Sequence, residues 1–242
     1  MPRYAIVSDV HSNIEALDAA LALIRDDDVL LCLGDIVGYG PNPNECVEKI
    51  SALATATVLG NHDVAAIDNY GLAYFNPAAR EAMRWTQRVI DAESTAWLNS
   101  LGYEFRMPEF LLVHGAPKNY FEYILDKAGA ARAFAATDAP LIFIGHTHIA
   151  EYYALESDGS IAHKHLQQGG EFTLVPGVRY IVNVGSIGQP RDLNPRASFG
   201  LYDSEARAMT IVRFDYPIAI VQEKIVAAHL PEALARRLIV GR

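Results

Sequence analysis

The feature that most constrains the fold of this chain is a series of short, strongly apolar runs that end abruptly in polar residues. The runs are three to five residues long, which suits a buried strand and is too short for a helix. Apolar residues at helical spacing separate the first two runs, so strand and helix alternate. This pattern predicts βαβ units and an α/β fold. The runs cover residues 4–7, 29–33, 57–59, 110–113 and 141–144.

Beyond about residue 150 the pattern becomes strand-rich, with short turns between the segments. We expect these segments to form a second, more antiparallel sheet. Residues 217–242 alternate apolar and charged residues at helical spacing, which predicts one or two amphipathic helices packed on the body or on a second subunit of a homo-oligomer. No long linker interrupts the chain, and we expect a single domain over residues 1–242. The strand-like segments are 151–155, 160–166, 171–175, 179–184, 199–202 and 209–214.

Composition excludes several classes of partner. A formal charge of −9 and a pI near 5.3 argue against binding of long nucleic acids. The amino terminus lacks the basic and apolar regions of a signal peptide, and no apolar segment reaches the length of a transmembrane helix. We therefore expect a cytoplasmic protein with no membrane partner. Cys32 and Cys46 show no CxxC spacing and are expected to be buried thiols.

Five of the eight histidines follow an apolar run within a few residues. Ligands in open α/β sheets bind at the carboxyl ends of the strands, so these histidines and nearby carboxylates are predicted to converge on one crevice. Asp9 and His11, like His146 and His148, are separated by one residue, so both members of each pair point to the same side of an extended segment. The five histidines are His11, His62, His114, His146 and His148.

The polar residues at these strand ends form a candidate metal-ligand set. They offer oxygen and nitrogen but no sulfur, which suits Mn²⁺, Fe²⁺ or Zn²⁺ in a catalytic site rather than a Cys-rich structural zinc site. Seven ligands are too many for one catalytic metal ion and suit two ions that share a carboxylate. The candidates are Asp9, His11, Asp35, Asn61, His114, His146 and His148.

Five motifs in order, D-x-H, GD, GNHD, a lone H-G after a strand and GHTH, resemble the calcineurin-like metallophosphoesterase superfamily over residues 9–148. The segment NVGSIGQPRDLNPRASFGLYD extends the resemblance toward the carboxyl terminus. The resemblance, to the small bacterial and archaeal phosphodiesterase type, implies a four-layer α/β sandwich. In it, two mixed β-sheets are flanked by helices, and a binuclear metal site lies at the carboxyl ends of strands.

Carried over by position, the resemblance also implies the roles of the site residues. Two divalent metal ions are expected, Mn²⁺ first, with Fe, Zn or Ni as alternatives. A hydroxide bridging the metals would be the nucleophile. His62 would stay uncoordinated, face the substrate, and stabilise the transition state or protonate the departing alkoxide. Asp9, His11 and His148 would hold the first ion, Asn61, His114 and His146 the second, and Asp35 would bridge them.

Several residues near these motifs have two interpretations. Asp63 orients His62 or caps a helix. Ser186 and Arg191 line the substrate side, or belong to a tight turn with a surface Arg-Asp pair. The aromatic segments 68–85 and 118–124 form a lid that stacks a nucleobase, or pack in the core. His163 and His165 lie in a polar segment without a matching carboxylate pattern, and we expect them to be surface residues.

The motifs also narrow the range of possible substrates. Protein phosphatases of the superfamily carry arginines where this chain has Tyr39 and Leu59, and neither residue can grip phosphate in a bidentate manner. The sequence therefore predicts a metal-dependent hydrolase of a small phosphorylated substrate, with phosphodiesters ahead of phosphomonoesters. Alternatives are a nucleotide or dinucleoside polyphosphate hydrolase, a binuclear amidohydrolase or lactonase, and a non-catalytic scaffold on the same fold.

Overall fold

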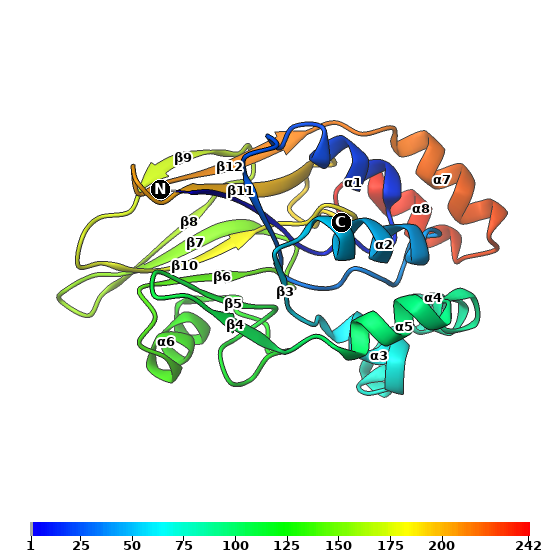
Figure 1. Cartoon of the computed structure of the whole chain (residues 1–242), viewed down its shortest axis with the longest axis horizontal. Helices are drawn as coiled ribbons and strands as arrows, with labels where there is room; N and C mark the ends of the chain where they lie inside the picture. Colours follow the sequence, from blue (N-terminus) through cyan, green and yellow to red (C-terminus); the bar gives the residue numbers. More distant parts are fainter. Residues whose placement is uncertain (1) are drawn as a thin grey trace.

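Two six-stranded mixed sheets lie face to face in the computed structural model, which describes residues 2–242 (Figure 1). The first sheet has the order β3-β2-β1-β11-β12-β9 and the second β4-β5-β6-β10-β7-β8. The first contains β1 (Arg3–Val7), β2 (Val29–Cys32), β3 (Ala56–Thr57), β9 (Gly170–Thr173), β11 (Ala197–Asp203) and β12 (Ala208–Phe214). The second contains β4 (Glu104–Arg106), β5 (Leu111–Val113), β6 (Leu141–Ile144), β7 (Ala150–Leu155), β8 (Ile161–His165) and β10 (Arg179–Val184).

The strands are apolar on both faces because successive side chains point to opposite sides and both sides are buried. In β1, Tyr4 and Ile6 join the core between the sheets, whereas Ala5 and Val7 face the helices. In β6, Phe143 lies between the sheets and Ile142 points toward α6 (Lys127–Ala136). A strand buried on both faces needs a continuous apolar run, which is the pattern that the sequence shows.

Helices cover the outer faces of both sheets and complete four layers (Figure 1). α6 packs on the second sheet, and α1 (Ile14–Leu21), α2 (Pro43–Leu53), α7 (Ile218–Ala227) and α8 (Glu232–Leu238) pack beside the first. Asn13 caps α1, because its Oδ1 accepts a hydrogen bond from the Ala16 amide at 3.1 Å. The predicted fold class is confirmed. The remaining helices are α3 (Asn61–Asp68), η1 (Leu72–Tyr74), α4 (Pro77–Val89) and α5 (Ala92–Asn99).

The late strands do not form a sheet of their own, so that expectation was wrong. β9, β11 and β12 complete the first sheet, and β7, β8 and β10 complete the second. β11 pairs antiparallel with β1, and β10 pairs parallel with β6. The early strands β1 and β6 each leave an edge that needs hydrogen-bond partners, and the late strands supply them.

The carboxyl-terminal segment packs on the body of the same chain through Val221, Ile225 and Leu234, which are buried. This confirms the first of the two expectations for that segment, and contact with a second subunit stays a prediction. Among the described residues, no helix combines the length and apolar character needed to cross a bilayer.

Phe143 provides a test of the core between the sheets. It is fully buried and contacts Phe110 and Tyr202 edge-on or tilted, with ring centroids 5.6 and 5.8 Å away. We expect Phe143→Ala to lower the free energy of unfolding by about 3–5 kcal/mol in urea denaturation, because it removes buried apolar area and leaves a cavity. Leu53→Ala, at a side chain that is 54% exposed, is the control. Equal effects of the two variants would contradict this assignment of the core.

Candidate metal centre

The candidate ligands converge where parallel strands end. Asp9 and His11 follow β1, Asp35 follows β2, His114 follows β5, and the His146-Thr147-His148 loop follows β6. Asn61 and His62 begin α3. The parallel pairing of β1 with β2 and of β5 with β6 aligns the strand ends within each sheet, and the packing of the sheets brings both sets together. None of the carboxylate and histidine members is more than 5% exposed.

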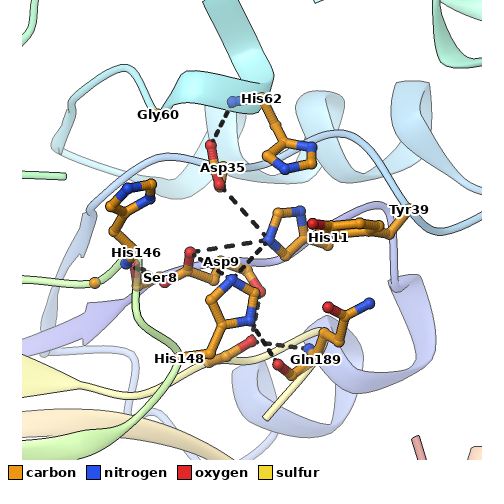
Figure 2. Close-up of polar contacts among 12 residues, drawn as sticks. Ser8, Asp9, His11, Asp35, Tyr39, Gly60, His62, His146, His148 and Gln189 are labelled. Carbon is orange, nitrogen blue, oxygen red and sulfur yellow. Dashed lines mark hydrogen bonds and ion pairs between the residues drawn. The ribbon is translucent and has the colours of Figure 1, made fainter. Parts of the chain in front are cut away.

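Two ligand groups share one carboxylate. The first consists of Asp9, His11, Asp35 and His148, and the second of Asp35, His114 and His146. Asp35 Oδ2 lies 3.6 Å from His11 Nε2 and 3.3 Å from His114 Nε2. Figure 2 shows the Asp35 carboxylate beside the imidazoles, with its other oxygen, Oδ1, accepting a hydrogen bond from the His62 amide at 2.8 Å. Asp35 therefore faces both groups.

Backbone carbonyls fix the orientation of each ligand imidazole. His148 Nδ1 donates to Gln189 O at 2.6 Å (Figure 2). His11 Nδ1 donates to Val37 O at 3.1 Å. A carbonyl only accepts, so each of these nitrogens carries the proton and, in a neutral ring, the opposite nitrogen presents a lone pair. The same device holds His114 through Leu33 O at 2.8 Å and His146 through Phe121 O at 3.0 Å. Such outer hydrogen bonds orient metal-binding histidines.

The donor set fits a divalent cation. His11 Nε2 and His148 Nε2 are 3.2 Å apart, and Asp9 Oδ1 lies 3.2 Å from His148 Nε2. These acceptors face one another without a proton between them, and Asp9 Oδ1 has no hydrogen-bond donor. Asn61 Oδ1 is likewise buried and without a donor. Buried acceptors that converge in this way need positive charge, and nitrogen and oxygen ligands suit first-row divalent metals.

Burial governs the protonation of the centre. It lowers the pKa of His11, His146 and His148 well below the ordinary histidine value, so these rings are neutral, as metal ligands must be. Burial also opposes the charge on His114, but the Asp35 carboxylate beside it raises the pKa of that imidazole to about 9. The negative charge of Asp35 thus holds a proton on His114. A divalent cation bound there would neutralise the same charge in place of that proton.

Tight backbone geometry brings the ligand loops together. A Cβ atom on Gly60 would lie 2.1 Å from Asp35 Oδ1, and one on Gly145 would lie 2.4 Å from Asp9 Oδ2, so both positions require glycine for close approach. Gly34, with φ of +86°, turns the chain before Asp35. Left-handed backbone conformations are costly for residues other than glycine and concentrate at functional sites. Five ligands adopt them, with φ between 48° and 66°: Asp9, His11, Asp35, His146 and His148.

His62 stands beside the ligands but belongs to neither group. Its ring packs between the rings of Tyr39 and Phe75, with centroids 4.5 Å away in each case, and its Nδ1 is buried without a hydrogen-bond partner. Burial lowers the pKa of His62 to about 4. The neutral ring therefore offers one N–H donor and one acceptor nitrogen beside the metal ligands.

Asp63 serves as a helix cap and a loop anchor rather than a partner of the His62 ring. Its Oδ2 accepts from the Gly60 amide at 3.0 Å, and its Oδ1 accepts from the amides of Ile36 and Val37 at 2.8 and 3.1 Å. These bonds tie the start of α3 to the loop that follows Asp35. The capping interpretation of Asp63 holds, with the added contact to the preceding loop.

Ser186 and Arg191 have different surroundings in the structure. Ser186 is fully buried, and its hydroxyl donates to Asp9 O at 2.9 Å and accepts from the Gln189 amide at 2.8 Å, so it supports the loop that carries Asp9. The Arg191 guanidinium lies 5.6 Å from the Tyr39 ring centroid and donates to the Tyr39 hydroxyl at 3.2 Å. Asp192 pairs with Arg213 instead of Arg191.

Some residues of the two aromatic segments pack in the core, and others lie at the centre, so each of the two interpretations holds for part of these segments. α4 packs into the core through Ala82 and Met83. Phe75, in the loop before α4, contacts His62, and Tyr123 stacks on His146 with centroids 3.8 Å apart while remaining 46% exposed. Part of each aromatic segment thus reaches the site.

Arg237 of α8 is a partly buried arginine that no sequence motif identified. Burial, with a smaller contribution from the positive charge of Arg191, lowers its pKa to about 10. The sequence offers only a pair of arginines in an amphipathic helix, a pattern that surface helices share.

His163 and His165 have the carboxylate partner that the sequence pattern lacked. Glu151 of β7 lies within 2.7 Å of His163 Nε2 and 3.2 Å of His165 Nδ1. His165 is exposed, as expected, but the His163 side chain is only 20% exposed. The expectation of a surface residue is confirmed for His165 and was wrong for His163. The expected lack of a carboxylate partner was wrong for both, because the partner comes from the neighbouring strand β7.

Comparisons with known proteins agree with this geometry. Residues 3–207 match the family model described as the calcineurin-like phosphoesterase superfamily domain. An uncharacterized protein from Methanocaldococcus jannaschii is 39% identical over 246 residues, covering 98% of each chain. The crystal structure of a metallophosphoesterase from Sphaerobacter thermophilus matches with a TM-score of 0.89 and 40% identity, covering 99% of this chain and 100% of that one. A hypothetical protein from Pyrococcus horikoshii shares the fold, with a TM-score of 0.79 and 19% identity over 100% of this chain and 99% of its own.

The close approach of Gly60 to Asp35 gives a test of the centre. We expect Gly60→Ala to weaken Mn²⁺ binding about 10–100-fold, because the added methyl group displaces the carboxylate that both ligand groups share. Metal affinity is measured by titration of the metal-stripped protein, and circular dichroism monitors folding. Gly102→Ala is the control, because its Cβ would meet nothing nearer than 3.7 Å. Unchanged affinity in a folded Gly60→Ala variant would contradict the role of this contact.

Proposed function

This chain belongs to the calcineurin-like phosphoesterase superfamily, and from that premise we propose that it hydrolyses a small phosphoester with two divalent cations in its buried centre. The observation that carries the proposal is the Asp35 carboxylate, which belongs to both ligand groups. A shared carboxylate is the arrangement that two neighbouring cations require. The nitrogen and oxygen ligands favour Mn²⁺, with Fe, Zn and Ni as competitors.

The chain would hold the cations with residues that the fold already orients. When bound, such a pair of cations lowers the pKa of water and neutralises charge on phosphoryl oxygens. Asp9, His11 and His148 would hold one cation, Asn61, His114 and His146 the other, with Asp35 between them. The backbone carbonyls behind His11 and His148 keep the metal-binding nitrogens of these neutral rings unprotonated, which raises their affinity for a cation, whereas His114 would release the proton that Asp35 attracts when a cation binds.

His62 would act on the substrate. It lies at the start of α3 directly after Asn61, and its ring contacts His11 with centroids 4.8 Å apart. Its Nδ1 is buried without a partner, so the other ring nitrogen, Nε2, would direct a hydrogen bond to a phosphoryl or departing oxygen. A donor in this position stabilises the charge that develops as the ester bond breaks, which contributes most for alkoxide leaving groups.

Arg191 would bind the phosphate, in line with its sequence-based interpretation as a residue on the substrate side. Its guanidinium lies over Tyr39, which occupies one of the positions where protein phosphatases of the superfamily carry an arginine. Its positive charge lowers the pKa of His11, His62, His146 and His148, in each case after the larger effect of burial. The Arg191 guanidinium could donate to phosphoryl oxygens of a phosphodiester or of a phosphomonoester.

The aromatic side chains at the site favour a nucleotide as the second candidate substrate. Tyr123, which stacks on His146, and Tyr70, whose ring centroid lies 6.3 Å from that of Phe121, are 46% and 63% exposed. Exposed aromatic rings stack on nucleobases without regard to base identity. A small diester with a nucleoside on its alcohol side would use both the phosphate grip and these rings.

Reconstitution tests the proposed activity. Metal-stripped protein is loaded with Mn²⁺, and bound metal and turnover of bis-p-nitrophenyl phosphate and p-nitrophenyl phosphate are measured. We expect two ions in the Asp35 centre and faster turnover of the diester, and we expect Asp35→Asn to lose both metal and turnover. Asp26→Asn, at an exposed position, is the control. A filled centre that hydrolyses neither ester would overturn the proposed activity, and an Asp35→Asn variant with full metal content and rate would refute the bridging role.

A second prediction concerns His62. We expect His62→Ala to keep its bound metal and to lose ~10²–10⁴-fold in rate, with a larger loss on esters with alkyl leaving groups than on nitrophenyl esters, because only the former need help with the departing oxygen. The exposed His229, replaced by Asn, serves as the control. Equal losses on both ester classes would remove the role of His62 at the leaving group.

A further inference from the structure

Outside the buried centre, a further cluster of side chains that could hold a metal ion lies on β7 and β8. These two strands form a hairpin at the edge of the second sheet (Figure 1). β7 and β8 pair antiparallel, with Glu151 opposite His165 and Tyr153 opposite His163. Residues two apart in a strand share a face, so Glu151, His163 and His165 all project from the same face of the hairpin. This is the face that packs against α6, because Tyr153 belongs to the α6 core.

The three side chains converge on one point. Glu151 Oε2 is 2.7 Å from His163 Nε2 and 3.2 Å from His165 Nδ1, and the two imidazole centroids are 4.5 Å apart. One potential ligand atom from each residue lies within 4.8 Å of the other two. Tetrahedral Zn²⁺ with ligands at about 2.0–2.1 Å requires ligand atoms about 3.3 Å apart, so small side-chain rotations are enough to form a site.

The environment holds two of the three ligands in place. The Glu151 side chain is only 3% exposed, and the His163 ring stacks on Tyr153 with centroids 4.2 Å apart and an interplanar angle of 9°. His165 is 62% exposed and keeps the cluster open to ions from solution. A buried carboxylate and an oriented imidazole present a rigid half-site, and the exposed histidine can close on an ion that arrives.

We propose that Glu151, His163 and His165 bind a divalent transition-metal ion at a site separate from the Asp35 centre. Two imidazoles and one carboxylate are a ligand set that Zn²⁺ accepts, with a fourth position for water or another small ligand. The site shares no residue with either ligand group of the buried centre. Filling it therefore does not compete for the ligands of that centre.

A metal ion at this site would change the charge of a neighbouring surface cavity. His165 lines a surface cavity of about 320 Å³ that Arg191 and Asp192 also line. Asp192 is paired with Arg213, so its charge is already balanced. An ion on the hairpin would add positive charge to the cavity that contains Arg191, the residue that we place at the phosphate.

The competing interpretation is that Glu151 only forms hydrogen bonds with the two imidazoles and that no ion binds. Counting the bound metal per chain distinguishes this interpretation from a metal site. The full-length, metal-stripped protein is dialysed against Zn²⁺, and bound zinc per chain is counted for wild type, His165→Gln, Glu151→Gln and His229→Asn. We expect the first two variants to bind one ion fewer than wild type, and the His229 control to bind as many as wild type. His165→Gln changes an exposed side chain, so loss of fold does not confound it.

Turnover of bis-p-nitrophenyl phosphate by the Mn²⁺-loaded variants checks that the Asp35 centre is intact. A loss of one Zn²⁺ from His165→Gln with Mn²⁺-dependent turnover retained supports a separate hairpin site. Equal zinc counts in wild type, His165→Gln and Glu151→Gln overturn the proposal and leave a hydrogen-bonded cluster. A zinc loss accompanied by the loss of turnover expected for Asp35→Asn also overturns it, because the ion would then belong to the Asp35 centre.

Discussion

The buried Asp35 carboxylate and the imidazoles around it need a positive charge beside them, and the arrangement of the centre follows from this need. Asp35 faces ligands from both sheets, and its Oδ2 lies within 3.6 Å of both His11 and His114. Acceptors without donors in a buried site are unfavourable unless a cation satisfies them. Their convergence therefore indicates that this part of the fold is arranged for cations, and the apolar layers around it supply the stability that holds it together.

The rest of the centre keeps these charged groups at short range. Glycines at positions 60 and 145 allow backbone to approach the carboxylates of Asp35 and Asp9 where a side chain would collide. Asp63 ties the helix that begins with Asn61 to the loop after Asp35, and the strained backbone of the ligand residues is held by the surrounding strands. A rigid support of this kind fixes ligand positions before any ion or substrate arrives.

Positive charge near the centre comes from distant parts of the chain. Arg191, in a loop after β10, lies over the Tyr39 ring and donates to its hydroxyl. A guanidinium therefore lies beside one of the two positions where protein phosphatases of the superfamily carry an arginine and this chain does not. The hairpin cluster of Glu151, His163 and His165 faces the same cavity as Arg191 through His165, so the hairpin and the centre are linked by a shared surface and by no shared ligand.

Local patterns in the sequence were enough for the alternation of strand and helix, the apolar character of both strand faces, and the positions of the candidate ligands after strand ends. Parallel strands bring their carboxyl ends to one edge, so residues that follow β1 and β2 meet without any further information, as do residues that follow β5 and β6. The two sets meet each other only because the two sheets pack face to face. Only the tertiary structure decided which sheet each late strand joins, that Glu151 meets His163 and His165, that Asp63 binds the loop after Asp35, and that Arg191 covers Tyr39. The physical reason is that these contacts join residues on different elements, and pairing and packing between elements depend on register across the whole core, which local spacing does not encode.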